Sequence, residues 1–284
     1  MTIWQKIENK LGEKIVAQHP VGGGCINQTY VIETENSKKI FCKINHSAPL
    51  DFFEKESEGL KALSQVKTWK VSSPLLHLNA GNTTCLLMEY VEKKHPTTEY
   101  WQNLGRSLAE LHKIYENNFG WKDDNYIGSL KQINNRKSSW EEFFISNRIE
   151  PLVKLALDKK IISKSEANLF TLLETKILNI FPKEKPALIH GDLWSGNVMP
   201  TIDNTPAIYD PAVYFGHREQ DLAMTILFGG FPSEFYRSYQ QHFPLHEDFL
   251  NRKDFYNLYP LLVHLILFGR SYWYDIEQIL RKLK

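Results

Sequence analysis

The chain has 284 residues, which is enough to bury a large core and suggests one or two domains. Its 34 basic and 33 acidic residues leave a net charge of +1, so global charge gives no case for binding nucleic acid or an acidic membrane surface. The N-terminus lacks the apolar core of a signal peptide, and three widely spaced cysteines (Cys25, Cys42 and Cys85) make neither a disulfide framework nor a metal site. We therefore expect a cytoplasmic protein with no membrane or nucleic-acid partner.

The first part of the chain has the pattern of a small sheet with two helices. Apolar residues at helical spacing predict a helix over 2–11 and a second from Ala48 or Leu50 to Val66. Alternating and β-branched residues predict five strands, over 14–19, 28–33, 39–44, 75–78 and 84–90. A strand, a glycine loop, a strand and then a strand carrying a lysine indicate a nucleotide-binding lobe, which we assign to residues 1–91.

The glycine loop, VGGGCIN over 21–27, allows two interpretations. Gly22, Gly23 and Gly24 can let main-chain N–H groups approach phosphate oxygens without interference from a β-carbon. Three glycines between strands can equally form an ordinary hairpin. Asn27 also stands where the last glycine of a full G-x-G-x-x-G loop would be, so the loop alone does not identify a nucleotide site.

Lys43 gives a more specific indication. A lysine inside an apolar strand is costly unless it is exposed or paired with an opposite charge. We expect its ammonium group to reach the α- and β-phosphates of ATP, held by a carboxylate from the helix that follows. Glu54, Glu56 and Glu58 are all available, and Glu56 is our choice because it lies on the inward side of that helix.

The fifth strand ends where we expect a connection between two lobes. Met88, Glu89 and Val91 lie at the point where this strand turns polar. The Glu89 carbonyl and the Val91 N–H are placed to pair with adenine, but a plain edge strand leading to a domain boundary fits the sequence as well.

From residue 92 to 284 the periodicity is mainly helical, which predicts a second lobe. We expect helices over 100–114, around 140–149, and over 163–180, 218–228, 232–242 and 254–282. A polar, Asn-rich segment over 122–139 is expected to be a loop. The overall class is therefore α+β.

The stretch from Leu188 to Asp221 carries the chemistry. Short apolar runs, expected to be strands, deliver Asp192 and Asp210, and Asn197 follows Asp192 by five residues. Phosphoryl transfer needs one carboxylate to orient and deprotonate the attacking hydroxyl, and an amide and a second carboxylate to hold Mg²⁺ against the phosphates. The three residues can fill these roles in that order. Each alone has an ordinary interpretation as a loop residue.

Side chains around this stretch are candidates for substrate contact. The Trp194 indole can stack on a sugar face or can be a structural residue under the loop. His217 and Arg218 can line the pocket or pair internally. We expect Asp221 to brace the catalytic loop by accepting main-chain N–H bonds, and His190 to be a structural hydrogen-bond partner, since no second ligand lies at metal spacing.

Cys25 suggests a redox hypothesis. It lies in a loop rich in N–H donors, which would stabilise a thiolate. Oxidation, or a disulfide between two copies, would then block phosphate binding. An unreactive thiol is the alternative, so the protein is expected to be a monomer or a redox-sensitive dimer. Cys42 and Cys85 fall in predicted strands and are expected to be buried.

The chain resembles the fructosamine kinase (ketosamine-3-kinase) family, which is related to aminoglycoside and choline kinases within the protein-kinase-like fold. The resemblance covers nearly the whole chain and rests on these segments: GGGCINQTY, FCKIN, FEKESEGLKAL, LLMEY, HGDLWSGN and IYDPAVYFGHREQDLAMTILFGGF. It implies two lobes, an N-terminal antiparallel-sheet lobe and a mainly helical C-terminal lobe.

The resemblance also implies residue roles and an activity. Asp192 matches the catalytic base, Asn197 and Asp210 the Mg²⁺ ligands, and Lys43 the phosphate-binding lysine paired with Glu56. The activity would be ATP-dependent phosphorylation of a sugar hydroxyl on a free or protein-bound ketoamine, after which the unstable product releases the amine. Alternatives are a kinase of another small acceptor, such as an aminoglycoside or amino alcohol, and an inactive nucleotide-binding scaffold.

Overall fold

The computed structural model describes residues 1–22 and 26–283. Gly23, Gly24 and Cys25, named above for the glycine loop and the redox hypothesis, lie outside the described residues. The chain forms two compact units. The first contains Met1–Leu104 and Gly196–Pro211, and the second contains Gly105–Ser195 and Ala212–Lys284. The first unit thus includes a segment from far along the chain, so a single boundary in the sequence cannot separate the two units.

A five-stranded antiparallel sheet forms the centre of the first unit. Its order is β1-β2-β3-β6-β5, with these bounds: β1 Ile15–Pro20, β2 Gln28–Thr34, β3 Lys39–Asn45, β6 Thr83–Glu89 and β5 Pro74–Ala80. All five strands predicted from alternation are confirmed. β3 and β6 are the most deeply buried strands of this sheet and have neighbours on both sides, whereas β1 is an exposed edge. The sheet therefore buries the two strands that hold Lys43 and Met88.

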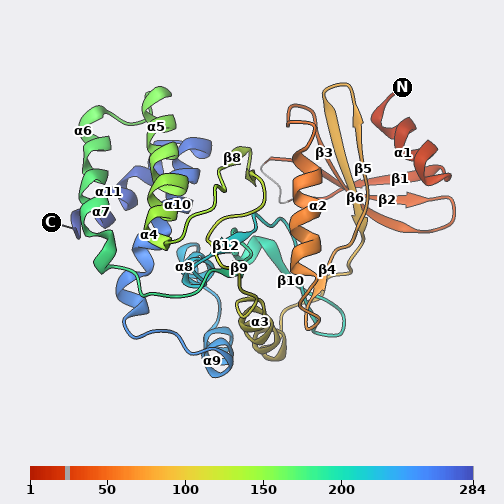
Figure 1. Ribbon diagram of the computed structural model, residues 1–284. Coiled ribbons are helices and arrows are strands. Elements are labelled where there is room, and N and C mark those ends of the chain that lie inside the picture. Colours follow the sequence, from red (N-terminus) through yellow and green to blue (C-terminus); the bar gives the residue numbers. More distant parts are fainter. Residues whose placement is uncertain (23–25, 284) are drawn as a thin grey trace. The chain divides into compact units, whose positions relative to one another are not determined.

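Two helices flank this sheet. α1 (Ile3–Leu11) begins with a capping box between Thr2 and Gln5 and buries Ile3 and Ile7. α2 (Phe52–Leu63) contacts β5 and β6 and lies alongside the sheet in Figure 1. It is shorter at both ends than the helix predicted to reach Val66.

A second, three-stranded sheet of the first unit was not predicted in full. β10 (Val198–Pro200) and β11 (Pro206–Ile208) form an antiparallel hairpin, and β11 pairs in parallel with β4 (Lys70–Val71). Only the β11 run was expected to be a strand. This sheet attaches the segment with Asn197 and Asp210 to the unit that holds Lys43.

The second unit is mainly helical, and α3 (Thr98–Leu111) runs into it from the first. Its α-helices are α4 Trp140–Phe143, α5 Glu150–Asp158, α6 Lys164–Ala167, α7 Thr171–Lys176, α8 Glu219–Leu227, α9 Ser233–His242, α10 Phe249–Phe268 and α11 Trp273–Arg281. A π-helical stretch, η1 (Phe144–Ile149), continues α4, and the short 3₁₀ turns η2, η3 and η5 span Asn168–Phe170, Ile177–Asn179 and Arg270–Tyr272. The 3₁₀ turn η4 (Ser195–Asn197) begins at the last residue of the segment Gly105–Ser195 and continues into the first unit. α10 is largely buried and packs against α5, α8 and α11. The mainly helical character predicted for this region is confirmed.

Three expectations need correction in detail. Residues 163–180 form short α and 3₁₀ pieces rather than one helix. The helix expected over 254–282 starts earlier, at Phe249, and stops before Gly269, whose φ of +103° L-residues rarely adopt. The segment 122–139 is not only loop, because β7 (Asn125–Ile127) and β8 (Leu130–Gln132) form a small hairpin.

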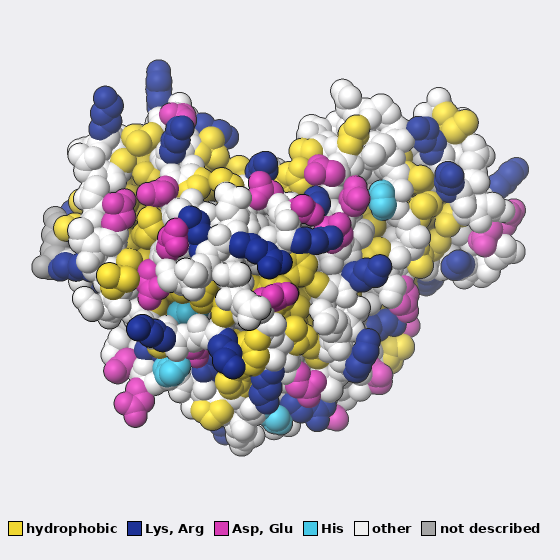
Figure 2. All heavy atoms as spheres, viewed as in Figure 1, with side chains coloured by type: hydrophobic (Ala, Val, Ile, Leu, Met, Phe, Trp, Pro, Cys, Tyr) yellow, Lys and Arg dark blue, Asp and Glu magenta, His cyan; other side chains and the backbone are white. Residues whose placement is uncertain are grey.

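The second unit also holds the strand that leads to the catalytic loop. β9 (Ala187–Ile189) pairs with β12 (Tyr214–Gly216) in an antiparallel ladder. Among the described residues, no helix is both long and apolar enough to cross a membrane. On the face shown in Figure 2, basic and acidic side chains are interspersed.

Candidate active site

Lys43, the lysine predicted to bind phosphate, is buried and has two acidic partners. Its side chain is 3% exposed, and its Nζ lies 2.5 Å from Oε1 of Glu56 on α2. It also pairs with Oδ1 of Asp210. The ion pair predicted between Lys43 and Glu56 is confirmed, and it explains how a lysine is accommodated in a buried strand.

The β10–β11 hairpin brings the amide and the second carboxylate together. Its register pairs Val198 with Ile208, so Asn197 and Asp210 flank the same end of the hairpin. The N–H of Tyr209 donates to the Asn197 carbonyl at 3.2 Å. Asp210 has a φ of +54°, a left-handed conformation that Asp tolerates better than most residues. Amide and carboxylate oxygens at one hairpin end are a donor set that suits a hard cation.

The described flanks of the glycine loop are fixed by β3. Nδ2 of Asn45 donates to Oδ1 of Asn27 at 2.9 Å and to the Ile26 carbonyl at 3.4 Å. A β-carbon on Gly22 would meet nothing within 4 Å, so the main chain there is open to approach. Asn45 was not singled out in the sequence; its place at the end of the lysine strand is the signal that could have identified it.

The end of β6 is held by β4 and the turn after it. Met88 is buried, and the Glu89 carbonyl accepts a bond from Oγ of Ser72 at 2.6 Å. The Glu89 carboxylate pairs with Lys70 at 2.8 Å. A carbonyl oxygen has a second lone pair, so the Ser72 bond leaves it able to accept another donor. Val91 is 7% exposed.

In the second unit, Asp221 holds the loop that carries Asp192. The two oxygens of this buried carboxylate accept the N–H groups of His190 at 2.7 Å and Gly191 at 2.9 Å. The Asp192 N–H donates to Nδ1 of His190 at 3.3 Å. The bracing role predicted for Asp221 and the structural role predicted for His190 are both confirmed.

His112, which directly follows the last residue of α3, supports the same loop and was missed as a functional residue. Its Nε2 lies 3.3 Å from Oδ2 of Asp221, and its Nδ1 lies 2.8 Å from the Tyr239 hydroxyl. Burial lowers the pKa of His112, although the Asp221 carboxylate acts in the opposite direction. In the sequence His112 falls on an apolar helix face, where it is indistinguishable from a core residue.

Trp194 is half-buried two residues after Asp192. Its ring contacts Phe228 edge-on, with centroids 6.4 Å apart, and Phe228 in turn lies 4.7 Å from His264. One side of the indole therefore has an internal partner, as the structural interpretation requires. The partial exposure also fits the interpretation in which the ring stacks on a sugar.

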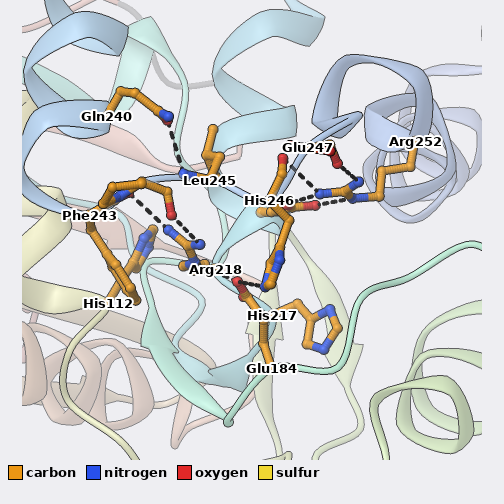
Figure 3. A network of polar contacts seen from close by, with 12 residues as sticks. His112, Glu184, His217, Arg218, Gln240, Phe243, Leu245, His246, Glu247 and Arg252 are labelled. Atoms are coloured by element: carbon orange, nitrogen blue, oxygen red, sulfur yellow. Dashed lines mark hydrogen bonds and ion pairs between the residues drawn. The ribbon is translucent and has the colours of Figure 1, made fainter.

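For His217 and Arg218, the structure contains the internal pairing. Arg218 donates to Glu184 at 2.8 Å and to the main-chain carbonyls of Phe243 and Pro244 (Figure 3). His217 is 1% exposed, and its Nδ1 lies 2.9 Å from the Tyr256 hydroxyl. Burial lowers the pKa of His217 well below its usual range, and Arg218 adds to the effect. These contacts place both side chains inside the second unit.

An open hollow of about 620 Å³ lies beside this network. It holds none of the residues predicted for catalysis and is lined by Asn179, Ile180, Phe181, Pro182, Leu245, His246, Glu247 and Arg252. The two cysteines expected in strands, Cys42 and Cys85, are fully buried, and burial raises the pKa of the Cys85 thiol to about 12. Both are therefore unreactive thiols.

These features define a class of protein. The fold is the two-lobed α+β, protein-kinase-like fold of small-molecule phosphotransferases, with a buried lysine–glutamate pair on the sheet and an Asp–Asn–Asp series after it. A "probable ketoamine kinase" of Synechocystis sp. is 36% identical over 99% of this chain and 95% of its own length. The chloroplastic protein-ribulosamine 3-kinase of Arabidopsis thaliana is 36% identical over 93% of this chain and 82% of its own.

A solved structure and a family model agree with these relatives. The crystal structure named "putative fructosamine-3-kinase" from Thermobifida fusca has a TM-score of 0.86 and 30% identity, covering 99% of this chain and 98% of that one. The model described as fructosamine kinase matches residues 1–284. The chain belongs to the fructosamine kinase family and is a phosphotransferase.

Proposed function

We propose that this protein transfers the γ-phosphoryl group of ATP to a sugar hydroxyl of a ketoamine. The observation that carries the proposal is the buried ammonium of Lys43 paired with Glu56 and Asp210 in a chain of this family. The two relatives above, named as a ketoamine kinase and a ribulosamine kinase, support the acceptor class. Phosphorylation would make the adduct unstable, so that the free amine is released and glycation is reversed.

The first unit would bind ATP. We assign the phosphates to the main chain at Gly22, Gly23 and Gly24 and to the Lys43 ammonium, which Glu56 keeps charged and oriented. The adenine edge would pair with the Glu89 carbonyl and the Val91 N–H. Support for this pairing comes from the Ser72 hydroxyl, which fixes the direction of the Glu89 carbonyl.

Asn197 and Asp210 would hold Mg²⁺, which neutralises charge on the phosphates when it is bound. Among the described residues there is no cluster of three His, Cys, Asp or Glu side chains that could hold a metal. That finding fits this assignment, because Mg²⁺ in kinases takes one or two protein oxygens together with phosphate oxygens and water. Lys43, paired with Asp210, would hold that carboxylate in place.

Asp192 would act as the general base. Its carboxylate would accept the proton of the sugar hydroxyl as the hydroxyl oxygen forms a bond to the γ-phosphorus and the bond to ADP breaks. The bonds from Asp221 to His190 and Gly191 support this role, because they hold the main chain just before the base. Trp194 would stack on the sugar. His217 and Arg218 would contribute less to substrate contact, because their side chains are engaged within the second unit.

Cys25 adds a proposal about oligomeric state. We propose that the protein is a monomer that forms a redox-sensitive dimer through Cys25, because its other cysteines, Cys42 and Cys85, are buried. Wild type and Cys25→Ser should differ in activity and in mass after treatment with oxidant. Equal activity and mass in both forms would remove this proposal.

A panel of acceptors tests the acceptor class. ADP release is measured with Mg-ATP and a fructosamine or ribulosamine of lysine, an aminoglycoside and an amino alcohol, with glycated protein as a further acceptor. We expect turnover with the ketoamines only. Turnover restricted to an aminoglycoside or amino alcohol would assign another acceptor, and ATP binding without turnover on any acceptor would indicate an inactive scaffold.

A further inference from the structure

The hairpin β7–β8 carries a buried amide network that the site described above does not use. The register pairs Asn125 with Gln132 across the two strands. Nε2 of Gln132 donates to Oδ1 of Asn125 at 2.7 Å, and Nδ2 of Asn134 donates to the same oxygen at 2.9 Å. All three side chains are at most 5% exposed. Polar side chains at this depth are costly unless every group is bonded, so such a network is rigid.

Arg148 fixes the far end of this network. Its guanidinium is fully buried, and Nη2 donates to Oδ1 of Asn134 at 2.8 Å. It lies 4.5 Å from the Phe143 ring, 4.0 Å from the Tyr214 ring and 5.2 Å from the Tyr259 ring. Aromatic faces stabilise a buried cation in place of water. The three rings form a cage around the guanidinium, and its bond to Oδ1 fixes the direction in which the Asn134 amide faces.

The near end of the network is bonded to the main chain beside the catalytic loop. Nε2 of Gln132 donates to the Ala212 carbonyl at 3.0 Å, and Nδ2 of Asn125 donates to the Val213 carbonyl at 2.9 Å. The Ala212 N–H donates to the His190 carbonyl at 2.9 Å. Ala212 thus connects the amide network to the residues immediately before Asp192.

Tyr259 closes the network from α10. Its hydroxyl donates to Oε1 of Gln132 at 2.6 Å, so both ends of the Gln132 amide are bonded. Burial raises the pKa of Tyr259, and the Asp192 carboxylate is among the nearby charges that act on it. The hydroxyl therefore stays protonated and donates to Gln132 throughout the neutral range.

We propose that Gln132, oriented by Tyr259, is a positioning residue for the catalytic base. It holds the Ala212 carbonyl in place, and Ala212 holds the turn at His190–Gly191 from which Asp192 projects. Asp221 fixes the N–H groups of that turn, and Gln132 acts on its other side through Ala212. This inference rests on the proposed role of Asp192.

Tyr259→Phe tests the proposal with little change in shape. The ring stays in the Arg148 cage, and only the bond to Gln132 is lost. We expect kcat for the ketoamine to fall about tenfold, because a small displacement of a catalytic group is costly. The dissociation constant of ATP and the KM of the acceptor should stay at their wild-type values. A general loosening of the fold would change these two constants as well as kcat.

Tyr256→Phe is the matched control. Tyr256 is also buried on α10, and its hydroxyl lies 2.9 Å from Nδ1 of His217. Its removal should change thermal stability about as much as Tyr259→Phe but leave kcat unchanged. A wild-type kcat in Tyr259→Phe, or an equal loss of kcat in the two variants, would overturn the proposal.

Gln132→Met and the double variant extend the test. Gln132→Met should lower kcat by about 10², and adding Tyr259→Phe should cause no further loss, because both changes act through one contact. Additive losses would show that Tyr259 acts by another route. Asp192→Ala separates the two proposals: if it keeps wild-type turnover, the proposed base is wrong, whereas inactivity of Asp192→Ala beside full activity of Tyr259→Phe overturns only the role of Gln132.

Discussion

Gly191 and Ala212 approach so closely that a β-carbon on Gly191 would lie 2.1 Å from the Ala212 carbonyl oxygen. Gly191 also has a φ of +82°, which L-residues rarely adopt. The turn before the catalytic base therefore requires glycine for two separate reasons.

Gly191→Ala should abolish turnover and lower the free energy of unfolding by more than about 4 kcal/mol, because neither main-chain segment can move away. Gly229→Ala is the control, since Gly229 has a φ of +94° but open space around it. It should lose only about 1–2 kcal/mol, the cost of the left-handed conformation. Urea unfolding of both variants measures the difference. Equal losses of stability in the two variants would show that the close approach of Gly191 to Ala212 adds nothing to the requirement for glycine.

Lys43→Met should lower kcat/KM for ATP by at least about 10², because a preorganised charge facing the phosphates is lost. It also leaves the Glu56 carboxylate buried without this partner, which should destabilise the first unit. Lys38→Met makes the same change of charge at an exposed position and should leave kcat/KM unchanged. Steady-state kinetics with varied ATP checks both variants; equal kinetics in the two would contradict the assignment of Lys43.

Asp221→Asn should slow catalysis and destabilise the second unit. The amide has one acceptor oxygen for the two N–H groups of His190 and Gly191, so one buried donor is left unpaired, at a cost of about 1–3 kcal/mol. Asp254→Asn, which removes ion pairs with Lys253 and Lys282, should cost less than about 1 kcal/mol and leave kcat unchanged. Chemical unfolding and kcat are measured for both, and a wild-type kcat in Asp221→Asn would show that the brace is dispensable.

Stability should fall as the solution is acidified below about pH 6.5. Burial lowers the folded-state pKa of His112 and lowers that of His217 further. The unfolded chain therefore takes up protons in this range that the folded protein does not, so the stability contributed by neutral histidines is present above the unfolded pKa and is lost below it. Each such histidine steepens the slope by at most about 1.4 kcal/mol per pH unit.

His217→Gln isolates one of these contributions. The difference between the free energies of unfolding at about pH 7.5 and about pH 5.5 should shrink by about 1 kcal/mol in the variant. An unchanged difference would show that His217 takes up no extra proton on unfolding.

The sequence predicted the parts of the site in which a charged side chain would be costly to bury without a partner. A lysine in an apolar strand needs a carboxylate, which led to Glu56, and an acid beside an apolar helix led to Asp221. The five strands of the main sheet followed from alternation in the same way. Each of these inferences started from the residue pattern of one short segment.

Long-range pairing was not predictable by these means. The parallel pairing of β11 with β4 joins short segments far apart in the chain, and neither has the length that gives a clear period. The polar residues of the hairpin with Asn125 and Gln132 predict a loop, and nothing in the local sequence indicates that these two amides bond the main chain at Ala212 and Val213. His112 was likewise hidden within an apolar helix face.

The most direct test of the central claim compares wild type with Asp192→Ala in two measurements: ATP affinity by titration, and phosphorylation of a lysine-linked ketoamine in Mg-ATP. We predict equal ATP affinity and a loss of at least about 10² in turnover, the scale of a general base. Turnover at the wild-type rate in Asp192→Ala would contradict the account.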